Sequence, residues 1–189
     1  TPGWYSVSLA VSNNTGGYAT RSKSAYVYVA PKIVYVSTNG SNLAPFETWQ
    51  RASTTITGAI NVALVTVSDT SSVLVADGLY TNPVQIEINK GITVRSVSGA
   101  TNTFLTHATA AFVFFWIHHA DAVLDGFTIT NAPNTSWGSP GAAYLQAGTI
   151  RNCTVVASGG GRCGAILMAG GVVTNCVIRD NADSGNSGN

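Results

Sequence analysis

The chain has 189 residues, of which 45% are hydrophobic and only 9% are charged, and its formal net charge is +1. This balance leaves no basic stripe that could neutralise a phosphate backbone, so we expect no nucleic-acid partner. The longest apolar run, residues 110–117, is too short to cross a bilayer, and we expect no membrane insertion. Twenty glycines and abundant Asn, Ser and Thr favour strands and turns and predict an all-β protein.

Residues 1–31 form the first predicted region. Tyr5, Val7, Leu9 and Val11 alternate with small residues, which predicts a half-buried strand, and residues 13–17 supply a turn. The run PGWYSVSLAVSN at 2–13, the glycines at 16 and 17, and YVYV at 26–29 resemble the closing strands of a PKD-type immunoglobulin-like domain. That resemblance implies a β-hairpin or a partial Ig-like sandwich acting as a spacer. Because an isolated ribbon is marginal in water, we expect it to pair with the next domain or with another chain.

Residues 32–189 form the second predicted region. It opens with a strand at 33–36 and continues into one apolar helix face. Further apolar runs occupy 73–80 and 91–94. The helix face consists of residues at helical spacing: Ile56, Ala59, Ile60, Ala63 and Leu64.

An internal repeat then decides the predicted architecture. VRSV at 94–97 aligns with LDGF at 124–127, IRNC at 150–153 and VTNC at 173–176. Gly126, Asn152 and Asn175 are residue types that tolerate positive φ, so each can turn the chain at a corner between two short strands. Stacked coils would then share two interior columns, one of Val94, Leu124, Ile150 and Val173, the other of Val97, Phe127, Cys153 and Cys176.

The helix face, the run VADGLY at 75–80 and the corner repeats together resemble the start of a right-handed parallel β-helix of the pectate-lyase-like superfamily. The resemblance implies a short β-helix of about five coils, with an N-terminal capping helix that plugs the first coil. It further implies a secreted or cell-surface protein whose partner is a polysaccharide.

Candidate binding residues follow from a register that sets 117–119 level with 143–145 and 166–168. Trp116, His118 and Tyr144 then face outward on one sheet, and Trp137 overhangs it from an inserted loop. In the resembled superfamily this sheet corresponds to the groove that holds polysaccharide. Aromatic rings with hydrogen-bonding tips suit sugars, so we predict substrate binding by these four residues, the alternative being that the aromatic run simply packs beneath a loop.

Whether the protein is an enzyme stays open. Elimination from a uronic acid would need His118 and Tyr144 as base and acid, and Arg95 or Arg151 to neutralise the carboxylate.

Glycoside hydrolysis would need two carboxylates across the scissile bond, and Asp121 with Asp125 is the nearest pair. The polygalacturonase motifs are absent, and so is an acidic cluster for calcium, so neither a metal nor another cofactor is expected.

Simpler roles are expected for the residues near the corners. Arg95, Asp125 and Arg151 would form a surface charge ladder, and Cys153 and Cys176 would stack as buried, reduced thiols. Our preferred hypothesis is a fragment of a secreted or cell-surface β-helix protein that attaches to polysaccharide. The alternatives are a polysaccharide lyase or glycoside hydrolase, and a structural solenoid that self-assembles by chain-to-chain β stacking at its open ends.

Overall fold

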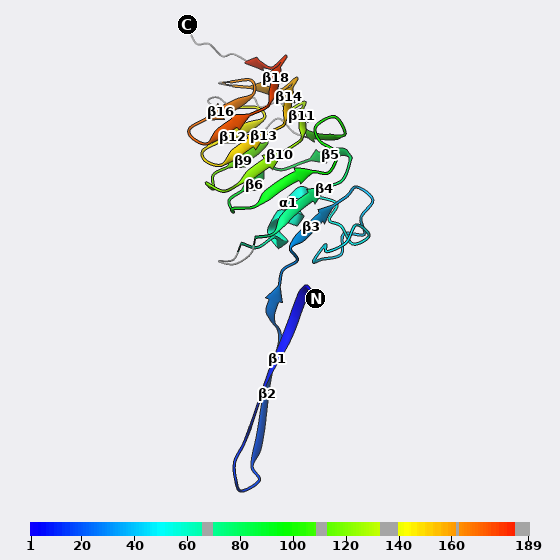
Figure 1. The fold of residues 1–189 in the computed structure, drawn as a ribbon, viewed down its shortest axis with the longest axis vertical. Helices are drawn as coiled ribbons and strands as arrows, with labels where there is room; N and C mark the ends of the chain where they lie inside the picture. The colour runs from blue at the N-terminus through cyan, green and yellow to red at the C-terminus, as the bar shows by residue number, and fades with distance from the viewer. Residues whose placement is uncertain (66–69, 109–112, 133–139, 162, 184–189) are drawn as a thin grey trace.

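The computed structural model describes residues 1–65, 70–108, 113–132, 140–161 and 163–183. It is an all-β protein with two parts, an N-terminal hairpin and a parallel β-solenoid of about four turns (Figure 1). The hairpin projects from the end of the solenoid at which the first coil lies, and the coils stack away from it toward the C-terminus. The all-β prediction is therefore confirmed, with a parallel solenoid at its centre.

The hairpin consists of β1 (Gly3–Ser12) and β2 (Tyr18–Val29), paired antiparallel with one register shift between Tyr5 and Val7. Its turn is held by the Asn13 side chain, which accepts hydrogen bonds from the backbone N–H groups of Thr15 and Gly17. The predicted strand and turn are confirmed, but the predicted half-burial is wrong. Every β1 residue after Gly3 is exposed, because no other described segment covers either face of the ribbon along these residues.

A short helix closes the first coil. β3 (Ile33–Val36) leads through a loop to α1 (Ile56–Val62), the only helix in the described part of the chain. The Thr55 hydroxyl accepts a hydrogen bond from Gly58 N–H, which caps the helix N-terminus. Ile56, Ala59 and Ile60 are buried against β3, β4 and β6.

The C-terminal end of α1 departs from the expected apolar face. Leu64 is 37% exposed, because the helix ends at Val62 and Ala63 turns the chain into extended backbone. The Lys90 ammonium donates to the carbonyls of Ile60 and Ala63, both at 2.8 Å, and so satisfies carbonyl groups that the helix leaves free. Burial lowers the pKa of Lys90.

Three parallel sheets form the walls of the solenoid. Sheet I contains β3 with β4 (Ser72–Val75), β7 (Thr93–Ser96), β10 (Val123–Asp125), β13 (Thr149–Arg151) and β17 (Val172–Thr174). Sheet II contains β5 (Gly78–Asn82), β8 (Thr103–His107), β11 (Thr128–Thr130), β14 (Thr154–Val156) and β18 (Val177–Arg179). Sheet III contains β6 (Ile86–Ile88), β9 (Phe115–Ile117), β12 (Ala143–Leu145) and β16 (Ile166–Met168). A small pair, β15 (Gly159–Gly160) and β19 (Ala182–Asp183), completes the described strands.

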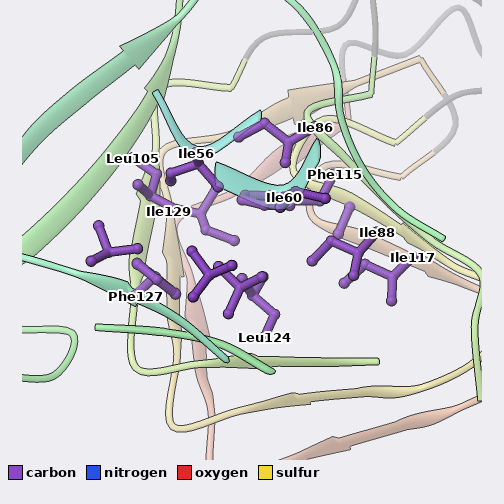
Figure 2. Close-up of a cluster of buried hydrophobic side chains, with 14 of the residues drawn as sticks. Ile56, Ile60, Ile86, Ile88, Leu105, Phe115, Ile117, Leu124, Phe127 and Ile129 are labelled. Carbon is purple, nitrogen blue, oxygen red and sulfur yellow. The ribbon is translucent and has the colours of Figure 1, made fainter. Parts of the chain in front are cut away.

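The number of coils is about four rather than the expected five. The difference lies in the first coil, where the chain passes from β3 to β4 through α1 and contributes no strand to sheet III. The helix lies across the end of the interior, and Ile56 and Ile60 meet the buried side chains of the sheets (Figure 2). The capping-helix prediction therefore matches the structure.

The first predicted interior column is confirmed. Leu124 is in register with Val94 on one side and with Ile150 on the other, and all three are fully buried. Val173 is in register with Ile150 and is only partly buried, because it lies in the last described coil. Removing these side chains from water supplies the main driving force that holds successive coils together.

The second predicted column is wrong at its first member. Phe127 and Cys153 are buried, but Val97 is 54% exposed. The chain leaves the sheet after Ser96 and returns only at Thr103, and the strand register sets Thr103 level with Phe127. Thr103 is fully buried, and its hydroxyl hydrogen-bonds that of Ser96 at 2.7 Å, which satisfies both polar groups inside the solenoid.

Candidate functional site

The outer surface of sheet III carries the predicted binding residues. Trp116 lies in register with Glu87 in the preceding coil and with Tyr144 in the next, and Tyr144 lies in register with Leu167. Successive side chains of a strand point to opposite faces, and the neighbours of Trp116, Phe115 and Ile117, are fully buried. The column of Glu87, Trp116, Tyr144 and Leu167 therefore faces outward.

The predicted register on this sheet was displaced by two residues. Ala143 pairs with Phe115 and not with Ile117, so Trp116 lies level with Tyr144, and His118 lies two residues further along, just after β9. Both Phe115 and Ile117 are buried, so the apolar pattern alone fits either register. Because a shift of two preserves the alternation, Trp116, His118 and Tyr144 still face outward together.

Hydrogen bonds and stacking hold these rings in place. The rings of Trp116 and His118 are stacked, with centroids 4.6 Å apart and planes 27° apart. The Trp116 indole N–H donates to Gln146 Oε1 at 2.8 Å, and Gln146 Nε2 donates to the Tyr144 hydroxyl at 3.1 Å. We call Glu87, Trp116, His118, Tyr144 and Gln146 the aromatic face.

The charged pair of the aromatic face joins two coils. His118 Nε2 lies 2.7 Å from Glu87 Oε1, and the two side chains are 29% and 44% exposed. At this exposure the attraction is screened by solvent, so the pair orients the imidazole more than it stabilises the fold.

The residues considered for elimination are not brought together. His118 and Tyr144 belong to the outer surface of sheet III, whereas Arg95 and Arg151 lie on β7 and β13 of sheet I. Sheets I and III are different walls of the solenoid, so neither arginine lies beside the aromatic face. A carboxylate bound over Trp116 would therefore lie near Glu87, which is in register with Trp116, and away from Arg95 and Arg151.

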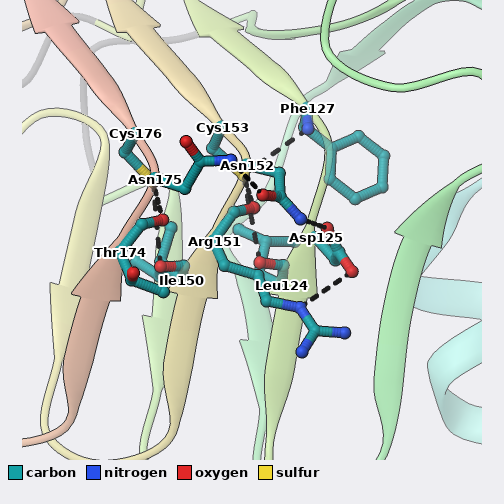
Figure 3. Close-up of polar contacts among 10 residues, drawn as sticks. All are labelled: Leu124, Asp125, Phe127, Ile150, Arg151, Asn152, Cys153, Thr174, Asn175 and Cys176. Carbon is teal, nitrogen blue, oxygen red and sulfur yellow. Dashed lines mark hydrogen bonds and ion pairs between the residues drawn. The ribbon is translucent and has the colours of Figure 1, made fainter.

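The two aspartates considered for hydrolysis lie near sheet I. Asp121 is in the exposed turn before β10, and Asp125 is the last residue of β10. Asp125 Oδ2 accepts from Arg151 Nε at 2.9 Å, and Asp125 Oδ1 accepts from Asn152 Nδ2 at 2.6 Å (Figure 3). Both oxygens of Asp125 are thus engaged in holding adjacent coils together.

The same contacts continue as a ladder along the corner between sheets I and II. Asn175 Nδ2 donates to Asn152 Oδ1 at 2.6 Å, one coil further on (Figure 3). Asn152 and Asn175 adopt φ values of 54° and 50°, and Gly126 adopts 80°, as the corner prediction required. Because Gly126 has no side chain, its neighbour Asp125 provides the acceptor in that coil. The predicted ion pair between Asp125 and Arg151 is present, and Arg95 is in register with Asp125.

The cysteines follow the same stacking. Cys153 is buried, Cys176 is partly exposed in the last described coil, and no disulfide joins them. A hydrogen bond with Cys176, together with burial, raises the pKa of Cys153. The same hydrogen bond lowers the pKa of Cys176 to about 6, against the opposing effect of desolvation. Of the two thiols predicted to be buried, only Cys153 is fully enclosed.

Two members of the aromatic face were missed by sequence reasoning. Glu87 stands between two buried isoleucines, a short apolar alternation that signals a strand, and Gln146 follows Tyr144 by two positions, the spacing that places two side chains on one face. The candidate Trp137 lies outside the described residues. Within the part of the chain that the structure describes, no group of three or more His, Cys, Asp or Glu side chains could hold a metal ion.

Comparisons with known proteins leave the chain unassigned. No family model, no curated protein and no solved structure matches it. None of the described helical segments is long and apolar enough to span a membrane.

Proposed function

We propose that this protein is a secreted or cell-surface β-helix protein, related to the pectate-lyase-like superfamily and preceded by PKD-type strands, that attaches to polysaccharide through the aromatic face. The observation that carries the proposal is the fixed, outward-facing arrangement of Trp116, His118 and Tyr144. Aromatic rings offer a flat apolar surface to the C–H faces of a sugar, and the Tyr144 hydroxyl, which accepts from Gln146 Nε2, keeps its own proton to donate to a sugar hydroxyl. The helix that plugs the first coil supports the superfamily assignment.

Pre-ordering of the rings favours binding. Gln146 bridges the Trp116 indole and the Tyr144 hydroxyl, so both rings are oriented before a ligand arrives. Side chains that are already ordered lose less conformational entropy on binding, and more of the contact energy then appears as affinity.

The charge of the aromatic face points to an uncharged polysaccharide. The strands β6, β9, β12 and β16 contain no Lys or Arg, and their one carboxylate belongs to Glu87. A uronate chain would place its own carboxylates near Glu87, and neither Arg95 nor Arg151 lies on this sheet to offset the repulsion. This is also why we prefer attachment to elimination, which requires the carboxylate of the sugar to be neutralised.

A glycan array that includes both neutral and uronate-containing chains tests the proposal. We expect binding to neutral chains and its loss in the double variant Trp116→Ala, Tyr144→Ala. Trp49→Ala and Tyr18→Ala remove an exposed tryptophan and an exposed tyrosine elsewhere and serve as matched controls. The proposal fails if the double variant, with an unchanged circular dichroism spectrum, binds neutral glycans as strongly as the intact chain, or if the intact chain binds no glycan.

A second candidate function is head-to-tail stacking of chains. Ile178 is in register with Val155, yet Val155 is fully buried and Ile178 is 48% exposed, together with Val172 and Val177 at 53%. The interior column thus continues into the last described coil without a cover there, beside strand edges that could pair with another copy. Light scattering over a concentration series tests this candidate. Growth of the mass with concentration, abolished by Ile178→Lys, is the expected result, and a constant monomer mass would exclude it.

A further inference from the structure

A second recess lies at the junction between the hairpin and the solenoid, away from the aromatic face. Its cavity volume is about 440 Å³, within the range of roughly 300–1,000 Å³ that small-molecule sites occupy. Trp4 and Tyr28 of the hairpin form one wall. The other walls come from Pro45 and Arg51 in the loop before α1, and from Asn61 in α1.

The aromatic wall is open to a ligand. The rings of Trp4 and Tyr28 lie with centroids 4.9 Å apart and planes tilted by 39°. Trp4 is 65% exposed, so much of the indole surface is free. A flat, partly apolar ring placed in the recess would cover that surface.

Three polar atoms at the same junction are left without a hydrogen bond. Among the described residues, Tyr28 Oη, Glu47 Oε2 and Arg51 Nε are buried and find no partner. Arg51 and Glu47 form an ion pair at 2.7 Å, and Arg51 lines the recess together with Tyr28. Unpartnered buried polar groups are costly, so native proteins usually satisfy them. Hydroxyl groups, which both donate and accept, suit this mixture of an N–H donor, a carboxylate acceptor and a phenol.

The charge of the recess is already balanced. Arg51 Nη1 donates to Glu47 Oε1 at 2.7 Å, and Arg51 Nη2 donates to the Ala44 carbonyl at 2.8 Å. The guanidinium is thereby paired, and only its Nε–H lacks an acceptor. An anionic ligand would have to break this pair, whereas a neutral ligand would leave it intact.

We propose that the junction recess binds a neutral, hydroxyl-rich ring, such as a pyranose of an uncharged oligosaccharide, stacked on Trp4, and that the side chains of Tyr28 and Arg51 turn toward it to hydrogen-bond its hydroxyl groups. This site is separate from the aromatic face and is formed by different residues. Because its walls come from both parts of the molecule, a bound sugar also bridges the hairpin and the solenoid.

Titration with cellobiose, maltose, lactose and diacetylchitobiose, followed through the Trp4 indole N–H by nuclear magnetic resonance, tests this site. At least one of these neutral sugars is expected to shift the Trp4 signal in a saturable way at millimolar concentration, and digalacturonate is expected not to. If none of the four does so, or if digalacturonate binds as well as they do, the proposal is overturned.

Variants separate this site from the aromatic face. Tyr28→Phe removes only a hydroxyl and is expected to weaken binding about fivefold, the usual effect of one hydrogen bond. Asn61→Phe, at an exposed position of α1, is expected to obstruct the recess and abolish binding. Tyr26→Phe is the matched control for Tyr28→Phe, and both Tyr26→Phe and Trp116→Ala should leave the sugar-induced shift of the Trp4 signal unchanged. Full binding by Asn61→Phe, or its loss in Trp116→Ala, would place the sugar elsewhere.

Discussion

Leu9 in the hairpin and Leu124 in the solenoid are both apolar residues of alternating strands, yet Leu9 is 65% exposed and Leu124 is completely buried. The hairpin strands are the longest of the chain, at 10 and 12 residues, whereas Leu124 belongs to a strand of three. Strand length therefore does not set burial in this molecule. A coil in the solenoid has neighbours above and below and shares an enclosed interior, while the two-stranded ribbon has neither.

The largest effect on stability is expected at Leu124, and comparison with Leu9 tests directly whether the two regions differ in burial. Leu124→Ala should lower the free energy of unfolding by about 2–5 kcal/mol, because it leaves a cavity in the middle of an interior column. Leu9→Ala should change it by no more than about 0.5 kcal/mol, since the side chain is already in water. Urea unfolding followed by far-ultraviolet circular dichroism measures both variants, and equal losses would mean that the hairpin is covered in solution.

Alkaline pH provides the next test of the enclosed interior. Burial raises the pKa of Tyr80 from 10.0 to about 12, with a smaller contribution from the Asp77 charge, and the Tyr80 hydroxyl donates to the Ala76 carbonyl. The folded state holds this proton more tightly than the unfolded state. Stability from Tyr80 is therefore complete below about pH 10 and is lost as the pH rises to about 12, by roughly 2–3 kcal/mol in total.

Unfolding of the intact chain and of Tyr80→Phe, compared over this pH range, isolates that loss. The variant should lack the decline, and Tyr26→Phe, which changes an exposed hairpin tyrosine, should retain it. A decline of the same size in Tyr80→Phe would show that another group is responsible.

The corner ladder allows a finer comparison within the solenoid. Asp125→Ala removes the acceptor of Arg151 and Asn152 and should lower the free energy of unfolding by about 1 kcal/mol. The effect is small because the Asp125–Arg151 ion pair is partly exposed to solvent, which weakens its contribution to stability. Asp121→Ala, at an exposed turn nearby, should have almost no effect. Scanning calorimetry reports the two shifts in Tm, and identical values would argue against a stabilising ladder.

The smallest expected effect concerns the gradient of burial along the solenoid. The Cys153 hydrogen bond lowers the pKa of Cys176, so Cys176 should be alkylated by iodoacetamide near neutral pH well before the buried Cys153. Cys153→Ala should slow that reaction several-fold at pH 7 and move its pH midpoint upward. Mass spectrometry of peptides gives the site of labelling, and earlier labelling of Cys153 would reverse the proposed order of burial.

The corner residues were the most predictable part of the fold. Gly126, Asn152 and Asn175 are residue types that accept positive φ, and the apolar residue two positions before each of them lies in the first interior column. The second interior column could not be predicted in this way. A loop follows Ser96, so Thr103 and not Val97 occupies the buried position in that coil, and a threonine gives no apolar signal in the sequence. Likewise, Phe115 and Ile117 fit the interior equally well, so their pattern could not settle the register of sheet III.

The candidate site could be predicted to a similar extent, in the orientation of its side chains but not in their partners. The outward orientation of Trp116, His118 and Tyr144 follows from alternation, which depends only on the local geometry of a strand. Trp116 meets Glu87 of the preceding coil and Gln146 of the following coil, and which residues of different coils meet depends on the length and path of the loops between them. The separation of Arg95 and Arg151 from Tyr144 likewise depends on the path of the chain between sheets, which local strand geometry does not determine.

By itself the sequence determined the parts that local chemistry controls, namely the strands, the corners, the apolar face of α1 and the alternation of inside and outside. Only the tertiary structure decided how the coils align, where α1 closes the first coil, that the hairpin stands uncovered, and which polar groups meet at the junction of Tyr28 with Arg51. The physical reason is that backbone preference acts between neighbours in the chain, whereas burial and hydrogen bonding between coils depend on segments that the chain brings together only after folding.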